Sequence, residues 1–197
     1  TELLYLDSEV TYKDLANKVV TVADNSKNTA QPDLSVNKAS FEPMLEIDHE
    51  KLTDINRDYV CWLSACGNKI SYPVVKGRSN EEYLHHTFFG DKSFVGSIFI
   101  DYRCNAELND FQTIIYGHSM KDRTMFRLIA DYTDKTFIEQ YPYFYIYTPD
   151  SRQKYQIFSI NLMDANELIT ALNEPSQTEK EAFISQKIQN SVYAAET

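Results

Sequence analysis

FVGSIFIDYRCNAELNDFQTIIYGH, residues 94–118, carries the clearest structural pattern in the chain. It contains two apolar runs of strand length, Phe94–Asp101 and Gln112–Gly117, and both are bounded by turn-forming polar residues. Short runs of this kind, rich in isoleucine and aromatic residues, are typical of buried strands. The stretch therefore predicts two strands joined by a polar loop.

Similar patterns continue on both sides of this stretch. Further strands are predicted at Tyr59–Leu63, Lys69–Val75, Tyr143–Tyr147 and Lys154–Ile160, the last two as a hairpin across Thr-Pro-Asp-Ser-Arg. Short helices are predicted at Asn80–Leu84, Thr124–Tyr132 and Lys135–Tyr141. A longer last helix is predicted at Thr178–Val192, with Thr178 and Glu181 as its capping box and Phe183, Ile184, Ile188 and Val192 facing inward.

The order of these elements predicts an α+β protein that is mainly β, with peripheral helices. Aromatic residues make up 13% of the 197 residues, which favours a sheet-rich body. Residues 1–57 are predicted to be an N-terminal helical appendage and arm, and residues 58–197 to be the β body. Within the appendage, apolar residues at helical spacing predict a helix at Thr11–Val22 that docks on the body.

Composition excludes several classes of function. A net charge of −10 argues against general nucleic-acid binding, because phosphate recognition needs a basic surface. No stretch of the sequence approaches the roughly 18 apolar residues that cross a bilayer. The three cysteines form no C-x-x-C pair, so neither a structural zinc site nor a disulfide scaffold is expected, and no cofactor or metal is predicted.

His118 is the strongest candidate for chemistry among the four histidines. It directly follows an apolar strand, where catalytic acids and bases are often placed. The alternative is a structural histidine that only bonds a loop. His85 and His86 are weaker candidates, because neighbouring residues on a helix point about 100° apart and would not share one metal.

The cysteines provide no clear nucleophile. Cys61 lies within a predicted strand and is expected to be a buried structural thiol. Cys66 and Cys104 lie near predicted turns, where exposure is expected. Although Arg103 adjoins Cys104, no neighbouring residue is obviously basic enough to lower the pKa of either thiol.

Taken together and in order, six segments resemble class B sortases, over roughly residues 50–193. The segments are Ile55-Asn-Arg-Asp-Tyr-Val-Cys-Trp-Leu63, Ile70-Ser-Tyr-Pro-Val-Val75, Asn80-Glu-Glu-Tyr-Leu84, Gly96-Ser-Ile-Phe-Ile-Asp-Tyr-Arg103, Thr113-Ile-Ile-Tyr-Gly-His118 and Met125-Phe126. The resemblance implies a sortase-type β-barrel with N-terminal helices and a helix in the long connection before the last two strands.

The resemblance also implies an activity and a location. Class B sortases are cysteine transpeptidases that cleave a C-terminal sorting signal through a thioester. They join the new C-terminus to a cell-wall precursor or to a pilin lysine, and they work without a cofactor. They are anchored by an N-terminal segment at the outer face of the cytoplasmic membrane of Gram-positive bacteria, and the resemblance implies the same place for this protein.

Site residues follow from the same resemblance. His118 matches the active-site histidine that protonates the departing amine. Asn80, Leu84 and Tyr116 match residues that line the substrate groove. Leu168 and Ile169 fall on the long connection that covers the groove in the family.

The chain departs from the family pattern at its C-terminus. Class B sortases continue into two further strands, which carry the nucleophilic cysteine in a Thr-Leu-Ser-Thr-Cys-like motif and then an arginine. This sequence reaches Thr197 before either one. The 197-residue chain is therefore expected to be inactive alone. Two other interpretations remain open: a sortase-like module that binds peptides without chemistry, and a plain surface domain in which His118 is structural.

Overall fold

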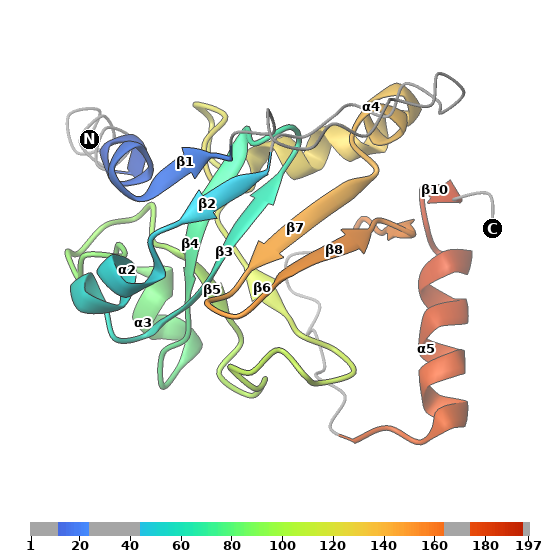
Figure 1. Cartoon of the computed structure of the whole chain (residues 1–197). Coiled ribbons are helices and arrows are strands. Elements are labelled where there is room, and N and C mark those ends of the chain that lie inside the picture. Colours follow the sequence, from blue (N-terminus) through green and yellow to red (C-terminus); the bar gives the residue numbers. More distant parts are fainter. Residues whose placement is uncertain (1–11, 24–43, 164–173, 195–197) are drawn as a thin grey trace, which may run out of the picture.

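The computed structural model describes residues 12–23, 44–163 and 174–194. Its centre is a six-stranded sheet in the order β6-β5-β4-β3-β7-β8, and two short strand pairs, β1-β2 and β9-β10, flank it (Figure 1). The strands are β1 Val20–Val22, β2 Leu45–Ile47, β3 Tyr59–Ala65, β4 Ile70–Val75, β5 Ile98–Ile100, β6 Ile115–Tyr116, β7 Tyr143–Tyr147, β8 Arg152–Gln156, β9 Ser159–Ile160 and β10 Tyr193–Ala194.

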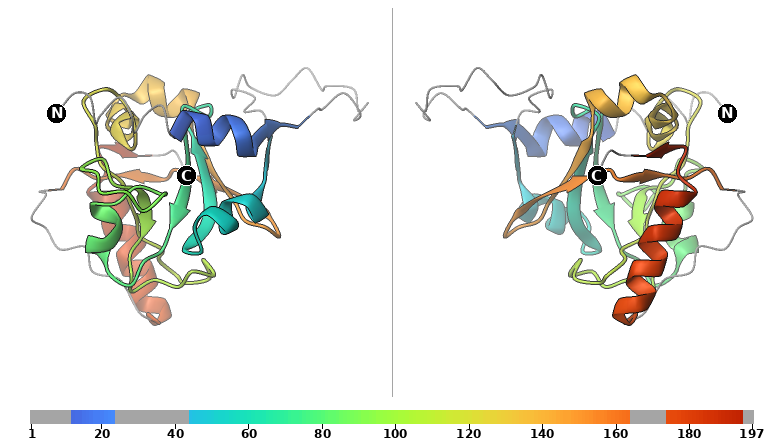
Figure 2. Two further views of the ribbon diagram at one scale, coloured as in Figure 1. Left: turned by 90° about the vertical axis from the view of Figure 1, so that its left-hand side faces the viewer. Right: turned by 90° about the vertical axis from the view of Figure 1, so that its right-hand side faces the viewer.

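Helices lie around this sheet, as the sequence predicted. They are a helix over residues 12–19, α2 His49–Ile55, α3 Asn80–Leu84, the 3-10 helix η2 Arg127–Thr133, α4 Lys135–Gln140 and α5 Gln177–Gln189. The sheet curls into part of a barrel, and α5 stands at the far end of the molecule from α2 (Figures 1 and 2). This arrangement confirms the predicted class, a mainly β protein with peripheral helices.

The pairing of the strands explains the position of α3. All neighbouring strands of the six-stranded sheet are antiparallel except β4 and β5, which are parallel and pair Val74 with Ile98 and Val75 with Phe99. Parallel neighbours need a crossover connection, and α3 lies within that crossover. As a consequence α3 sits beside β5 and brings its side chains to the end of that strand.

The core of the protein is formed by side chains from the sheet and the elements packed on it. Trp62, Ile98 and Ile100 are at most 1% exposed, and Phe88 and Leu52 join them from the flanking segments. Burial of a large apolar side chain contributes about 1.5–3 kcal/mol. The two apolar runs in residues 94–118 therefore do supply buried strands, although β5 and β6 are shorter than predicted.

The N-terminal helix docks on this body, which confirms that prediction. Tyr12, Leu15 and Val19 are all buried. The Tyr12 hydroxyl donates to the carbonyl oxygen of Gly96 at 3.1 Å and accepts from the backbone N–H of Phe88 at 3.0 Å. The predicted end of the helix is wrong, since Val20–Val22 forms β1 and pairs with β2 instead of continuing the helix.

The last helix also differs from its prediction. Its capping box uses Ser176 and Glu179 in place of Thr178 and Glu181, and it ends at Gln189. The residues predicted to face inward are Phe183, Ile184, Ile188 and Val192; Phe183 is half-buried against Phe111, while the other three are 37–49% exposed. Within the described residues this apolar side of α5 is largely uncovered.

Candidate active site

His118 is placed by the segment that directly follows β6. Gly117 precedes it, and a Cβ there would overlap the Ile98 side chain and lie 2.6 Å from the Phe126 ring. Only glycine fits this spacing without moving its neighbours. Directly after it, the carbonyl oxygen of His118 accepts from the N–H of Phe126 at 2.8 Å, which fixes the backbone of the histidine.

The imidazole of His118 is tied to the end of α3. Its Nε2 lies 3.1 Å from the backbone carbonyl oxygen of Leu84 and therefore donates to it when protonated. The residue is half-buried. Because Nε2 makes the bond to Leu84, Nδ1 is the nitrogen without this partner. The bond links residues that are 34 positions apart and brings two predicted site residues, His118 and Leu84, together.

Gly96 lies close to the same carbonyl. Its φ is +60°, in the left-handed region that disfavours other residues. A Cβ at Gly96 would lie 2.6 Å from the oxygen of Leu84 and 2.7 Å from that of Tyr83. Glycine here therefore permits the close approach of the strand that places Leu84 beside His118.

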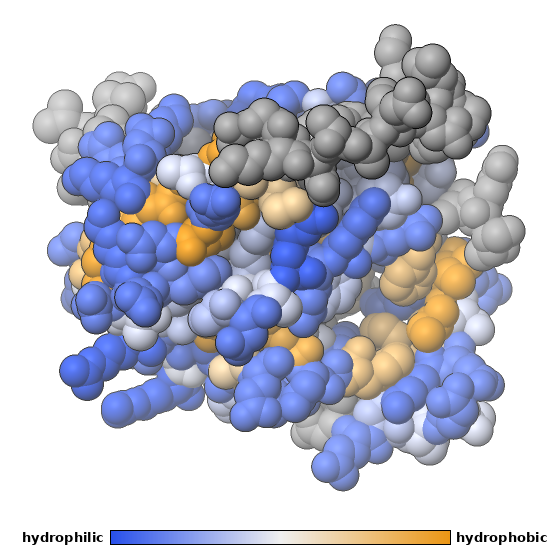
Figure 3. Space-filling view, in the orientation of Figure 1, coloured by the Kyte–Doolittle hydropathy of each residue, from blue (hydrophilic) through white to orange (hydrophobic). Residues whose placement is uncertain are grey.

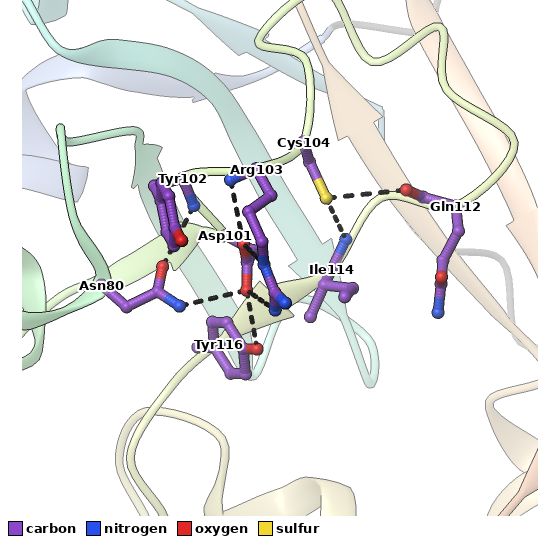
Figure 4. Close-up of polar contacts among 8 residues, drawn as sticks. All are labelled: Asn80, Asp101, Tyr102, Arg103, Cys104, Gln112, Ile114 and Tyr116. Carbon is purple, nitrogen blue, oxygen red and sulfur yellow. Dashed lines mark hydrogen bonds and ion pairs between the residues drawn. The ribbon is translucent and has the colours of Figure 1, made fainter. Parts of the chain in front are cut away.

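Asp101 organises the other side of the site. It follows β5 with its side chain fully buried, and it accepts hydrogen bonds from Asn80, Tyr116 and Arg103 (Figure 4). The Asn80 Nδ2 and the Tyr116 hydroxyl are 3.0 and 2.9 Å from the same carboxylate oxygen. The predicted site residues Asn80 and Tyr116 are thus brought together by a residue that was not predicted to belong to the site.

The hydrogen bonds to the Asp101 carboxylate favour its negatively charged form. Hydrogen bonds from Arg103 hold the pKa of Asp101 well below its usual range, and Asn80 and Tyr116 add to this effect. In return, the bond to Asp101 raises the pKa of Arg103. Burial raises the pKa of Tyr116, and the bond to Asp101 raises it further, so this hydroxyl keeps its proton at neutral pH.

All three cysteines lie in the described residues, and all are buried. Burial raises the pKa of Cys61 to about 12. The thiol of Cys66 donates to the Tyr132 hydroxyl at 3.4 Å. Cys104 accepts from the N–H of Ile114 and donates to the carbonyl oxygen of Gln112, and burial raises its pKa (Figure 4). The expected exposure of Cys66 and Cys104 is wrong, because both turns fold back onto the core.

The other histidines have separate local partners. His85 is exposed and lies 3.8 Å from Glu81, and the Nδ1 of His86 bonds the carbonyl oxygen of Glu82. The Nδ1 of His49 bonds the Tyr59 hydroxyl at 2.8 Å. Residues 12–23, 44–163 and 174–194 contain no group of three His, Cys, Asp or Glu residues that could hold a metal ion.

A broad apolar hollow lies next to the site. Its volume is about 450 Å³, and residues on the inner side of the curved sheet and on the 156–161 segment line it, among them Leu63, Ile70, Ile115, Phe144 and Phe158. Figure 3 shows apolar surface at the hollowed region between the sheet and α5. Ile115 connects the hollow to Tyr116, the next residue of β6.

The structure therefore joins four of the six predicted site residues through two hydrogen-bond systems: His118 with Leu84, and Asn80 with Tyr116. Leu168 and Ile169 lie outside the described residues. The sequence analysis did not single out Asp101 as a site residue. Its position directly after three buried strand residues, with Arg103 two residues on as an ion-pair partner, was the signal that its carboxylate is buried too.

Comparison with known proteins identifies the family. Over 175 residues the chain is 32% identical to sortase B of Listeria monocytogenes, an alignment that covers 89% of this chain and 70% of the relative. The X-ray structure of Clostridium perfringens sortase B is 32% identical and superposes with a TM-score of 0.70, covering 76% of this chain and 82% of that one. A Staphylococcus aureus sortase B–substrate complex is 28% identical, also with a TM-score of 0.70, over 75% and 68% of the two chains. No protein-family model matches the chain.

The chain belongs to the sortase B family, and its fold and relatives place it among the cysteine transpeptidases. No helix in the described ranges has the length and apolarity needed to cross a membrane.

Proposed function

We propose that this chain provides the peptide groove and the acid–base histidine of a transpeptidase that cleaves a C-terminal sorting signal and transfers the protein to an amine. The observation that carries the proposal is the bond between His118 and the Leu84 carbonyl. It holds a half-buried imidazole beside α3, and it leaves Nδ1 without this partner, ready for proton transfer.

The reaction requires two proton transfers. A thiolate attacks the carbonyl carbon of the scissile peptide; a C–S bond forms, the C–N bond breaks, and the imidazolium of His118 gives its proton to the departing nitrogen. An acceptor amine then attacks the thioester, a new C–N bond forms, and the thiolate leaves. Neutral His118 takes the proton from the attacking amine, which returns the site to its first state.

None of Cys61, Cys66 and Cys104 is this nucleophile. Reactive thiols lie in partly exposed, electropositive surroundings that lower their pKa. Here all three are buried, and burial raises the pKa of Cys61 and of Cys104. We therefore expect the polypeptide of these 197 residues to cleave no sorting-signal peptide by itself.

The proposed substrate is a peptide that carries the sorting signal; a substrate complex is described for the similar Staphylococcus aureus sortase B. In this proposal Asn80, Leu84 and Tyr116 line the groove that receives this peptide. The acceptor is a cell-wall precursor or a pilin lysine. The protein acts at the outer face of the cytoplasmic membrane of a Gram-positive bacterium, held by an N-terminal anchor.

A second candidate is a sortase-like domain that binds peptides without cleaving them. The burial of Cys61, Cys66 and Cys104 favours it, because reactive thiols lie in partly exposed, electropositive surroundings. The two candidates differ in one product, the acyl-enzyme thioester.

Trapping that thioester tests the proposal. The complete gene product is incubated with a randomised peptide library whose members carry a fluorophore and a quencher. The reaction is stopped with acid, and the acylated residue is located by mass spectrometry. We expect an acylated thiol at a position other than Cys61, Cys66 and Cys104. Acylation of one of these three would contradict the proposal, and binding without cleavage would support the second candidate.

A further inference from the structure

Asp101 is an unusual residue to be fully buried. Its carboxylate is 0% exposed, and aspartate is almost never fully buried unless it is paired. Oδ1 accepts from the Arg103 backbone N–H at 2.9 Å and from its Nε at 2.8 Å. Oδ2 accepts from Arg103 Nη2 at 2.8 Å, from Asn80 at 3.0 Å and from Tyr116 at 2.9 Å. Both oxygens are thus fully used.

These bonds fix more than the position of the carboxylate. The Asn80 amide has a second partner, because its Oδ1 accepts from the Tyr102 N–H at 3.0 Å. With its nitrogen on Asp101 and its oxygen on Tyr102, the amide has one orientation (Figure 4). An ionised carboxylate has no proton to give, so Tyr116 must be the donor in its bond to Asp101.

We propose that Asp101 is a positioning residue of the substrate groove, whose negative charge sets the Asn80 amide and the Tyr116 hydroxyl in the orientations that meet the peptide. The inference rests on the proposed function, since the peptide is the ligand that these two side chains meet. Arg103 completes the arrangement. Its guanidinium binds both carboxylate oxygens, so it balances the charge and prevents the carboxylate from turning.

An amide cannot replace this carboxylate. Asparagine offers one oxygen and one NH₂ group at the same place, so Asp101→Asn would set a donor nitrogen against Arg103 or against Asn80 and Tyr116. In either orientation at least two donors lose their acceptor. Side chains on α3 and β6 would then be free to turn, while the chemistry at His118 would be untouched.

Kinetics of the complete gene product test the proposal. The probe is the best-cleaved member of a randomised, internally quenched peptide library. For Asp101→Asn we expect KM to rise about tenfold with kcat within about threefold, the size expected when hydrogen bonds to a charged group are lost. The control is Asp131→Asn, which breaks an ion pair with Arg123 and Arg127 that involves none of the groove residues, and whose KM should not change.

A double-mutant cycle separates positioning from simple stabilisation. If Asp101 acts through Asn80, the KM effects of Asp101→Asn and Asn80→Ala will be clearly less than additive. Additive effects, or an unchanged KM together with a lower Tm, would overturn the proposal. If Asp101→Asn does not fold, Arg103→Lys is the second variant. It removes the two-pronged contact of Arg103 with the Asp101 carboxylate, and the Arg103 side chain is 36% exposed, so folding should be less affected. KM should rise in this variant too.

A failure of the proposed function has a different signature. If the wild-type gene product neither binds nor cleaves any peptide, the proposed function fails while the orientation of Asn80 remains measurable. The Asn80 side-chain NH₂ resonances of the 197-residue chain should be well separated and protected from exchange, and they should lose both properties in Asp101→Asn. Unchanged Asn80 resonances in this variant would overturn the positioning role.

Discussion

Replacing Gly96 with alanine tests whether the close approach at the Leu84 carbonyl positions His118. Gly96 has a φ of +60°, and an added Cβ would lie 2.6 Å from the Leu84 oxygen, to which His118 is bonded at 3.1 Å. The left-handed backbone conformation costs an alanine about 1–2 kcal/mol. Overpacking against backbone atoms, which cannot rotate away, costs about 1–3 kcal/mol more. We expect Gly96→Ala to lower the free energy of unfolding by about 2–5 kcal/mol.

Gly90→Ala is the matched control. Gly90 also has a positive φ, of +85°, but a Cβ there would meet no atom within 4 Å. It should therefore cost only the backbone term of about 1–2 kcal/mol. Urea denaturation measures both variants in the 197-residue chain, and NMR follows the His118 ring. If Gly96→Ala destabilises no more than Gly90→Ala, or leaves the His118 resonances unchanged, the role assigned to this contact is wrong.

Two further predictions concern Leu84 of the proposed groove and Asp101. Leu84 is only half-buried, so Leu84→Ala should lower the free energy of unfolding of the complete gene product by less than about 2 kcal/mol and raise its KM for the library peptide. A decrease of about 2–5 kcal/mol in the free energy of unfolding with an unchanged KM would show that Leu84 anchors the core instead. For Asp101, the folded-state pKa lies below the unfolded value of about 4, so its contribution to stability is complete above that value and is lost as pH falls below it. The stability difference between wild type and Asp101→Asn, measured by urea denaturation, should therefore be largest above about pH 5 and shrink toward pH 3, and a difference independent of pH would contradict the ionised state assigned to Asp101.

Local sequence signals predicted the elements that local interactions decide. Helix α3 was predicted with its observed bounds, because the run is polar and then apolar, with Tyr83 and Leu84 at its end. His118 was recognised because it follows an apolar run directly. At α5 two capping-box patterns overlap, Ser176 with Glu179 and Thr178 with Glu181, and both fit the rule equally well. The choice between them was not available from spacing alone.

Long-range pairing decided what the sequence pattern missed. Val20–Val22 continues a helical apolar spacing, but it pairs with Leu45–Ile47 as a strand. A prediction from neighbouring residues cannot include a partner that lies more than 20 positions away in the sequence. Asp101 resembled a local ion pair because Arg103 is two residues away. Its other partners, Asn80 and Tyr116, are 21 and 15 residues distant. The β4–α3–β5 crossover brings Asn80 to it, and the antiparallel pairing of β5 with β6 brings Tyr116.

Turnover by a matched pair of histidine variants tests the central claim most directly. His118 is bonded to the Leu84 carbonyl at the proposed site, whereas His85, the residue after α3, is exposed beside Glu81. The measurement is the kcat/KM of the complete gene product for the library peptide, with glycinamide as the acceptor. The transpeptidation product is quantified by mass spectrometry. The account predicts that His118→Ala loses at least about a hundredfold with its Tm nearly unchanged, while His85→Ala stays near wild type. A folded His118→Ala variant that still forms the product at the wild-type rate would contradict it.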